Sequence, residues 1–383
     1  MAPPAPPPYG VYVHFPWCSF RCPYCDFAVA VEAEVPEARY AAALRAELEA
    51  RRPPFAGLAA RSLYLGGGTP SLFAPERIAE VIAAVRDRCQ LPAGAEVTLE
   101  ANPESCHPAR LAAFREAGVN RLSLGVQSFD AAVLAKLGRR HRPEDATRAV
   151  QAARGAFENV SVDVIYGARR STVATAREDG ARLAALGVPH VSAYALTVEA
   201  EALGEETPLA RLRRAGRLPL PPDEEVVAQA RALRGALRRG GLRRYEISNF
   251  ARPGFESVHN RLYWSSDAYL GIGVGAYGCA PLPGGAAVRW GNARTPAAWF
   301  EAVEAGRLPT AEEDRLGPPE RAEERVLLAL RTREGLPEDE VAAGRRGEVD
   351  ALLRARLAVR RGGNIVLTSR GMDVHSAVVE RLI

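Results

Sequence analysis

Several features are scarce in this sequence, and each scarcity excludes a class of protein. Only six of the 383 residues are cysteine, and three of these lie close together near the start of the chain. Cysteines so few and so unevenly placed do not form the disulfide framework of a secreted domain. The opening stretch, MAPPAPPPYG, has no basic segment and no apolar run, so no signal peptide is expected.

Long uncharged segments are also missing. The longest, residues 268–288, contains six glycines and two prolines, which excludes a spanning helix and indicates tight turns. The net charge is only +4, so bulk charge gives no argument for a nucleic-acid partner, and none is expected. We therefore expect a cytoplasmic protein without a transmembrane segment, in a compartment where thiols stay reduced.

What is present is a regular alternation of short β-branched or aromatic runs with longer amphipathic ones. The helical pattern is clearest at 36–52, 75–89 and 108–118, where apolar residues recur at spacings of three and four. This rhythm predicts an α/β fold with a parallel sheet and favours a partial (β/α)6 barrel over a doubly wound open sheet. The expected strands are 10–15, 61–66, 95–101, 120–126, 159–167 and 190–197.

The regular alternation of strand and helix patterns ends at about residue 200. A helical pattern at 320–336 and a hairpin expected to turn at Gly362–Gly363 suggest a small, mostly helical, winged-helix-like C-terminal domain. The predicted organisation is therefore a flexible leader, a partial barrel, an extension of that core and the C-terminal domain. Their boundaries are 1–9, 10–215, 216–305 and 306–383.

Three cysteines follow the first expected strand. Cys18, Cys22 and Cys25 have the spacing C-x3-C-x2-C, and no fourth cysteine follows. Three thiolates can hold three irons of a 4Fe–4S cluster and leave the fourth iron open for another ligand. Two alternatives remain open: a zinc site completed by Cys89 or Cys106, and unrelated buried cysteines.

Short sequence motifs elsewhere in the chain accompany the cysteine loop. Together with the cysteine loop they resemble the radical S-adenosylmethionine superfamily, and within it the oxygen-independent coproporphyrinogen III oxidase-like family, nearest its haem chaperone branch. The resemblance covers almost the whole chain. The motifs are GGGTPS (66–71), LEANPE (99–104), NRLSLGVQSFD (120–130), LGRRH (137–141), YEISNFARPG (245–254) and HNRLYW (259–264).

The resemblance implies a 4Fe–4S cluster on the three cysteines, with S-adenosylmethionine on the open iron. In the family, electron transfer from the reduced cluster cleaves the sulfonium bond, while the protein ligates, orients and excludes water. Glycines at 66–68 would let backbone groups approach the cofactor closely. The implied contacts are Gly67, Gly68, Thr69, Glu100, Gln127, Arg139 and Asp163, with Tyr12, Tyr24, Thr197 and Tyr277 as further ones.

The HNRLYW motif is associated with haem in the chaperone branch. It implies His259 as the first choice of iron ligand and Tyr263 and Trp264 as flat apolar contacts for a porphyrin. Seen in isolation, His259 would more often be a hydrogen-bonded structural histidine.

The residue at position 27, Phe27, distinguishes between two candidate functions. Members that decarboxylate coproporphyrinogen III carry a further cysteine two residues after the third, where this chain has Phe27. The resemblance therefore implies a haem chaperone that delivers haem to haemoproteins, respiratory ones among the candidates. The alternative is an oxygen-independent coproporphyrinogen III dehydrogenase, and radical methyltransferases share much of the core. A dimer is one of the open oligomeric states.

Two departures from the family pattern stand out. The segment DVIYGARRST (163–172) lacks the usual proline-glycine loop, and Tyr277 stands where many chaperone members have histidine. Both departures put contacts near the expected cofactor or haem in question.

Overall fold

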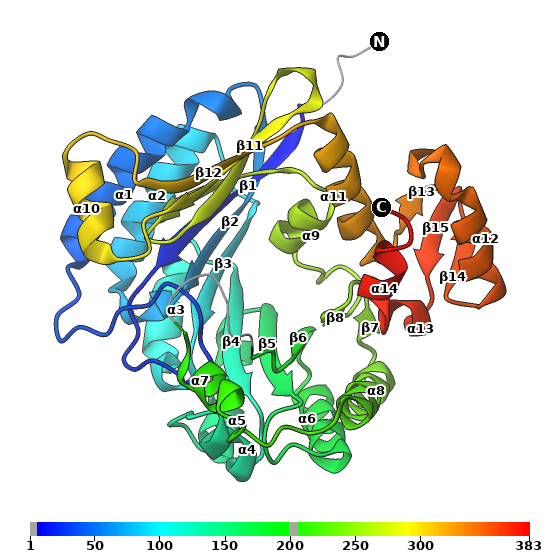
Figure 1. Cartoon of the computed structure of the whole chain (residues 1–383). Coiled ribbons are helices and arrows are strands. Elements are labelled where there is room, and N and C mark those ends of the chain that lie inside the picture. Colours follow the sequence, from blue (N-terminus) through cyan, green and yellow to red (C-terminus); the bar gives the residue numbers. More distant parts are fainter. Residues whose placement is uncertain (1–5, 199–205) are drawn as a thin grey trace.

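Six parallel strands form the centre of the molecule (Figure 1). The structure is a computed structural model and describes residues 6–198 and 206–383. Each strand pairs in parallel with the next along the chain, so the order in space is the order in sequence. This confirms the predicted partial barrel. The strands are β1 Pro8–Phe15, β2 Ala59–Gly67, β3 Glu96–Ala101, β4 Arg121–Gln127, β5 Asn159–Tyr166 and β6 His190–Ala195.

Helices cover the outer face of this curved sheet (Figure 1). The predicted helices at 36–52, 75–89 and 108–118 are confirmed to within two residues at each end. These outer helices are α1 Glu37–Arg51, α2 Pro75–Cys89, α3 Pro108–Glu116, α4 Ala131–Lys136, α5 Pro143–Ala156 and α6 Val173–Ala185. Later in the chain come α7 Pro208–Arg214, α8 Asp223–Arg239 and α10 Pro296–Glu304.

The strands are apolar on one face and polar on the other. In β3, Val97 and Leu99 are fully buried in the main hydrophobic core, whereas Thr98 and Glu100 point to the opposite face. The same alternation recurs in β2, β4, β5 and β6, so the concave side of the sheet is lined by hydroxyl, carboxyl and guanidinium groups. Buried polar groups need partners, and this polar interior is where a ligand can bind.

Short strands extend the sheet at both edges. Beside β1 lie β9 Ala268–Gly273, β10 Tyr277–Pro281, β11 Ala287–Asn292 and β12 Thr310–Leu316; beside β6 lie β8 Asn249–Ala251 and β7 Arg243–Arg244. The sequence prediction placed 310–316 in the C-terminal domain, but β12 pairs with β11 in the main sheet. Its sequence, TAEEDRL, is rich in charge and poor in strand-forming residues, so periodicity did not reveal it.

One helix lies against the concave side. α9 (Val258–Trp264) contains the HNRLYW motif and packs on β1, β2 and β9. Glu96 holds its first turn: the carboxylate accepts hydrogen bonds from Ser257 Oγ (3.3 Å) and from the amides of Val258 and His259 (3.0 Å each). A carboxylate at a helix N-terminus satisfies amides that have no partner within the helix.

The C-terminal part has a hydrophobic core of its own, formed by residues between Val326 and Leu382. The predicted hairpin is confirmed, and both Gly362 and Gly363 at its turn have positive φ. The domain boundaries themselves stay predictions. This part contains α11 Pro318–Leu330, α12 Arg346–Arg354, α13 Ser369–Met372, α14 His375–Val379 and a small sheet of β13 Leu336–Pro337, β15 Asn364–Leu367 and β14 Ala358–Arg361.

A buried carboxylate joins this part to the barrel. Glu246 is fully buried and accepts two hydrogen bonds from Arg331, at the end of α11, with distances of 2.9 and 3.1 Å. The same carboxylate accepts from the amide of Ser248 and the side chain of Asn249. None of the helices in the described part of the chain is long and apolar enough to cross a membrane.

We expect Arg331→Ala to lower the free energy of unfolding by about 2–3 kcal/mol, because the buried Glu246 charge would lose its cationic partner. Urea denaturation followed by circular dichroism measures this. Arg315→Ala is the matched control, since its ion pair with Glu313 is exposed and should change stability by less than about 0.5 kcal/mol. Equal effects of the two substitutions would contradict the assignment of Arg331 as the stabilising partner of Glu246.

Candidate functional site

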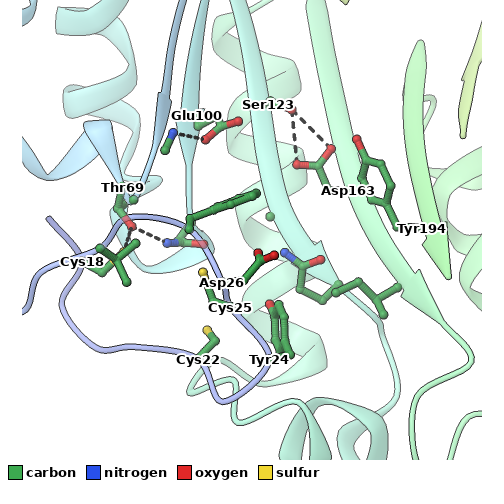
Figure 2. A pocket seen from close by; sticks show the side chains of 18 of the residues that line it. Cys18, Cys22, Tyr24, Cys25, Asp26, Thr69, Glu100, Ser123, Asp163 and Tyr194 are labelled. Carbon is green, nitrogen blue, oxygen red and sulfur yellow. Dashed lines mark hydrogen bonds between the residues drawn. The ribbon is translucent and has the colours of Figure 1, made fainter. Parts of the chain in front are cut away.

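The carboxyl ends of the strands surround a cavity of about 490 Å³, the cluster cavity (Figure 2). This is the end at which parallel α/β barrels place their active sites. Most of the predicted site residues line it, although they come from seven separate segments of the chain. They are Cys18, Cys22, Tyr24, Cys25, Gly67, Gly68, Thr69, Glu100, Gln127, Arg139, Asp163 and Thr197.

The three cysteines lie in the loop between β1 and α1, and none forms a disulfide. Cys18 Sγ lies 3.4 Å from the hydroxyl of Thr69, and Arg139 donates to Cys22 Sγ at 3.5 Å. Burial raises the pKa of Cys18, and it raises that of Cys25 to about 12. Burial therefore disfavours the thiolate form at both positions, and a nearby positive charge such as that of bound iron would favour it.

The alternative zinc site does not fit these positions. Cys89 ends α2 and lies beside Tyr9, and Cys106 donates to the carbonyl of Asn102 from within the main core. Neither lines the cluster cavity, so neither can complete a tetrahedral set with the loop cysteines. Three thiols along one cavity wall fit a cluster, in which each thiolate binds its own iron.

Asn102 links several of the predicted residues. Its amide donates to Thr69 Oγ1 at 2.9 Å and accepts from Arg139 at 2.6 Å, and Arg139 also donates to the carbonyl of Gly125. The chain Cys18–Thr69–Asn102–Arg139–Cys22 therefore closes a ring of contacts around the cysteine loop. Sequence reasoning quoted Asn102 within LEANPE but assigned it no role.

Two carboxyl groups line the cavity, one at the end of β3 and one on β5. Glu100 accepts from the Tyr64 hydroxyl (2.8 Å) and the Gly67 amide (3.0 Å), and Ser123 donates to Asp163. Burial is the main cause that raises the pKa of Glu100 to about 7 and that of Asp163 to about 6. Such carboxyls can accept hydrogen bonds from the hydroxyl and ammonium groups of a polar ligand.

Gln127 has a strained backbone. A register shift at the end of β4 places it at φ +70°, in the left-handed region that non-glycine residues rarely adopt. The bulge turns its side chain into the cluster cavity. Strain of this kind at a cavity wall is consistent with a binding role.

The glycines of GGGTPS serve the protein's own packing. Gly67 has φ +110°, and a Cβ there would lie 2.6 Å from the ring of His14; a Cβ on Gly68 would lie 2.7 Å from the carbonyl oxygen of Trp17. Their small size is thus required even before a ligand binds.

Two predicted cofactor contacts lie outside the cluster cavity. Tyr12 and Tyr277 line an adjoining cavity of about 300 Å³, which shares Asp26 and Phe27 with the cluster cavity. Tyr12 is hydrogen-bonded to His14, and Tyr277 donates to Glu312. Thr197, by contrast, is exposed on the rim of the cluster cavity.

The HNRLYW residues separate into two environments. His259 is 1% exposed, with Nδ1 2.8 Å from Ser62 Oγ and Nε2 2.8 Å from the Tyr263 hydroxyl. Burial lowers its pKa to about 3, so the ring is neutral. Tyr263 and Trp264 line another cavity, of about 450 Å³, together with Tyr269.

Comparison with known proteins agrees with this geometry. The model of the "Radical SAM superfamily" matches residues 12–179. The "Heme chaperone HemW" of Mycobacterium tuberculosis is 39% identical over 100% of this chain and 97% of its own length. The chain belongs to the HemW family of radical SAM proteins.

The chain is also similar to other proteins of known name. The Escherichia coli "Heme chaperone HemW" is 35% identical over 77% of this chain and 76% of its own. The mouse "Radical S-adenosyl methionine domain-containing protein 1, mitochondrial" is 39% identical over 85% and 74%. Among solved structures, coproporphyrinogen III oxidase (HemN) from Escherichia coli superposes with a TM-score of 0.81, covering 100% of this chain and 91% of that one, at 22% identity. At that identity the likeness shows the shared fold.

The buried carboxyl of Glu100 gives a pH-dependent prediction. Its folded pKa of about 7 lies above the ordinary value of 4.5, so its contribution to stability is full below pH 4.5 and is lost as pH rises through 7. In the unsubstituted chain without bound ligands, the free energy of unfolding should therefore decrease as pH rises through this range. In Glu100→Gln the decrease should be smaller by roughly 2–3 kcal/mol.

Urea titrations at several pH values measure that slope. Glu313→Gln, at an exposed carboxylate, is the control and should leave the slope unchanged. If Glu100→Gln has the same slope as the unsubstituted chain, Glu100 does not carry this pH dependence.

Proposed function

We propose that this chain is a haem chaperone, which binds haem and delivers it to haemoproteins. The observation that carries the proposal is the 39% identity, across the whole chain, to a relative named for that function. The proposal includes a 4Fe–4S cluster on Cys18, Cys22 and Cys25 and S-adenosylmethionine in the cluster cavity. Respiratory haemoproteins are candidate acceptors, and the unpaired thiols suit a reducing compartment such as the cytoplasm.

The residues of the cluster cavity support this assignment of cofactors. The three thiols share one wall, and Arg139, whose Nε has no hydrogen-bond partner among the described residues, lies beside them. Glu100 and Asp163 line the same cavity and offer acceptors for the polar groups of S-adenosylmethionine. When bound, the cluster and S-adenosylmethionine together supply one-electron chemistry, and the protein orients them and limits solvent access.

Phe27 supports the chaperone over the decarboxylase. Its side chain is 57% exposed and lines both the cluster cavity and the adjoining one. A phenyl ring here presents an apolar surface between the cluster loop and the tyrosines beyond it. A cysteine at the same position would place a reactive thiol there instead.

Substitution of single loop cysteines tests the cluster. Cys18→Ala, Cys22→Ala and Cys25→Ala should each lose most of the iron and sulfide bound after anaerobic reconstitution, because two thiolates hold a cluster poorly. Cys89→Ala is the matched control, since this buried thiol lies away from the cavity, and it should retain the full iron content. Iron and sulfide analysis with visible absorption gives the readout. Retention of the cluster in all three loop variants would contradict the site.

Two assays on one preparation test the function. The reconstituted chain should take up haem with a shift of the Soret band and pass it to an apo-haemoprotein. With coproporphyrinogen III, S-adenosylmethionine and reductant under anaerobic conditions, it should form no protoporphyrinogen IX at a catalytic rate. Catalytic product formation would show a decarboxylase instead.

A further inference from the structure

Asn102 follows β3 directly, and its backbone is held firmly by the 3₁₀ turn η3 (Pro103–Ser105). The Asn102 carbonyl accepts hydrogen bonds from the Ser105 amide (3.0 Å), the Ser105 hydroxyl (2.9 Å) and the Cys106 thiol (3.4 Å). The Ser105 hydroxyl also lies 2.7 Å from that of Ser71, in the GGGTPS motif. The side chain of Asn102 therefore enters the wall of the cluster cavity from a fixed backbone.

The two neighbours of the Asn102 amide determine its orientation. Arginine can only donate hydrogen bonds, so the atom that faces Arg139 Nη2, 2.6 Å away, has to be the amide oxygen. The amide nitrogen then faces Thr69 Oγ1, at 2.9 Å, and donates to it. An amide turned the other way would set two donors against each other at Arg139.

The same direction continues from Thr69 to Cys18. The Thr69 hydroxyl is buried, and its oxygen lies 3.4 Å from Cys18 Sγ (Figure 2). A hydroxyl carries one proton, and Asn102 offers it a donor instead of an acceptor. A thiolate can only accept a hydrogen bond. Once Cys18 is deprotonated, the hydroxyl proton therefore points to its sulfur.

Arg139 brings a second donor to the cysteine loop. Its Nη1 donates to Cys22 Sγ at 3.5 Å, while Nη2 is held by Asn102 and by a backbone carbonyl. Two of the three loop sulfurs thus receive hydrogen bonds that depend on Asn102. Cys18 receives one by way of Thr69, and Cys22 receives one from the guanidinium that Asn102 holds.

Hydrogen bonds to the sulfurs of an iron–sulfur cluster change its reduction potential. On reduction such a cluster gains one electron and no bond breaks, so the reduced form carries one more negative charge. An N–H or O–H group aimed at a sulfur stabilises that charge and raises the potential. The effect is larger in a partly buried cavity, where the effective dielectric constant is low.

We propose that Asn102 is a positioning residue that sets the reduction potential of the cluster. It fixes the direction of the hydrogen bond from Thr69 to Cys18, and it holds Arg139 beside Cys22. The proposal rests on one part of the proposed function, the cluster on the three loop cysteines. Neither haem nor S-adenosylmethionine enters it.

The test is a redox titration of the reconstituted full-length chain without S-adenosylmethionine, with dithionite as reductant and EPR of the reduced cluster as readout. Thr69→Val removes the hydroxyl. The midpoint potential should then fall by the equivalent of about a tenfold change in the reduction equilibrium, which is about 59 mV for one electron. Thr69→Ser keeps the hydroxyl and should stay near the unsubstituted value. Thr98→Val is the matched control, because it makes the same substitution at a buried position whose hydroxyl contacts Arg121 instead.

Asn102→Asp tests the direction of the hydrogen bonds. The carboxylate in this variant accepts from both neighbours, so it draws the Thr69 proton away from Cys18, and the midpoint potential should fall. The added charge also lowers the potential by itself. The Thr69→Val background separates the two effects: there Asn102→Asp should lower the potential by less than it does in the unsubstituted chain.

Three results would overturn the proposal. In the first, Thr69→Val has the unsubstituted potential at full iron and sulfide content. In the second, Thr69→Ser shifts the potential as much as Thr69→Val does. In the third, Asn102→Asp has the same effect in both backgrounds. Thr69→Ala is a second variant without the hydroxyl and should shift the potential in the same direction, so the test stands even where Thr69→Val assembles poorly. An unsubstituted chain that binds no cluster would instead defeat the proposed function itself.

Discussion

The concave face of the sheet is polar, and the structure depends on satisfying those polar groups where water is limited. Helix α9 does much of this. Glu96 binds the amides that open the helix, and Ser62 binds the ring of His259. Tyr64, next on the same face of β2, stacks on His259 and donates to Glu100. A continuous set of contacts thus runs from the cluster cavity to the cavity lined by Tyr263 and Trp264 through one short helix, which contributes Asn260 to the first and Tyr263 to the second.

Much of the fold could be predicted because local patterns control it. The six strands were recognisable from their β-branched runs, and the outer helices from apolar residues spaced by three and four. β12 was not recognisable from the sequence, because an exposed edge strand needs no alternation of apolar residues and the residues of β12 are mostly charged. The assignment of residues 310–316 to a domain therefore depended on the pairing of β12 with β11, which only the tertiary structure shows.

The site was predictable to a similar degree, and for a different reason. The three cysteines, Glu100 and Asp163 stand at strand ends, and parallel strands bring such positions together. Asn102 was missed because its role comes from a contact with a distant residue, Arg139. The motif predicted haem contacts at His259, Tyr263 and Trp264 alike, and sequence spacing could not show that the histidine faces the barrel interior.

The two edges of the long sheet have a consequence for association. An open sheet leaves unpaired amides and carbonyls that can recruit strands from other molecules. Here one edge ends in β12, where acidic and basic side chains are exposed, and the other in β7, which is only two residues long. Both edges therefore discourage strand-to-strand aggregation, which favours helices and loops as the surface for a specific contact with another protein, including a second copy of the chain.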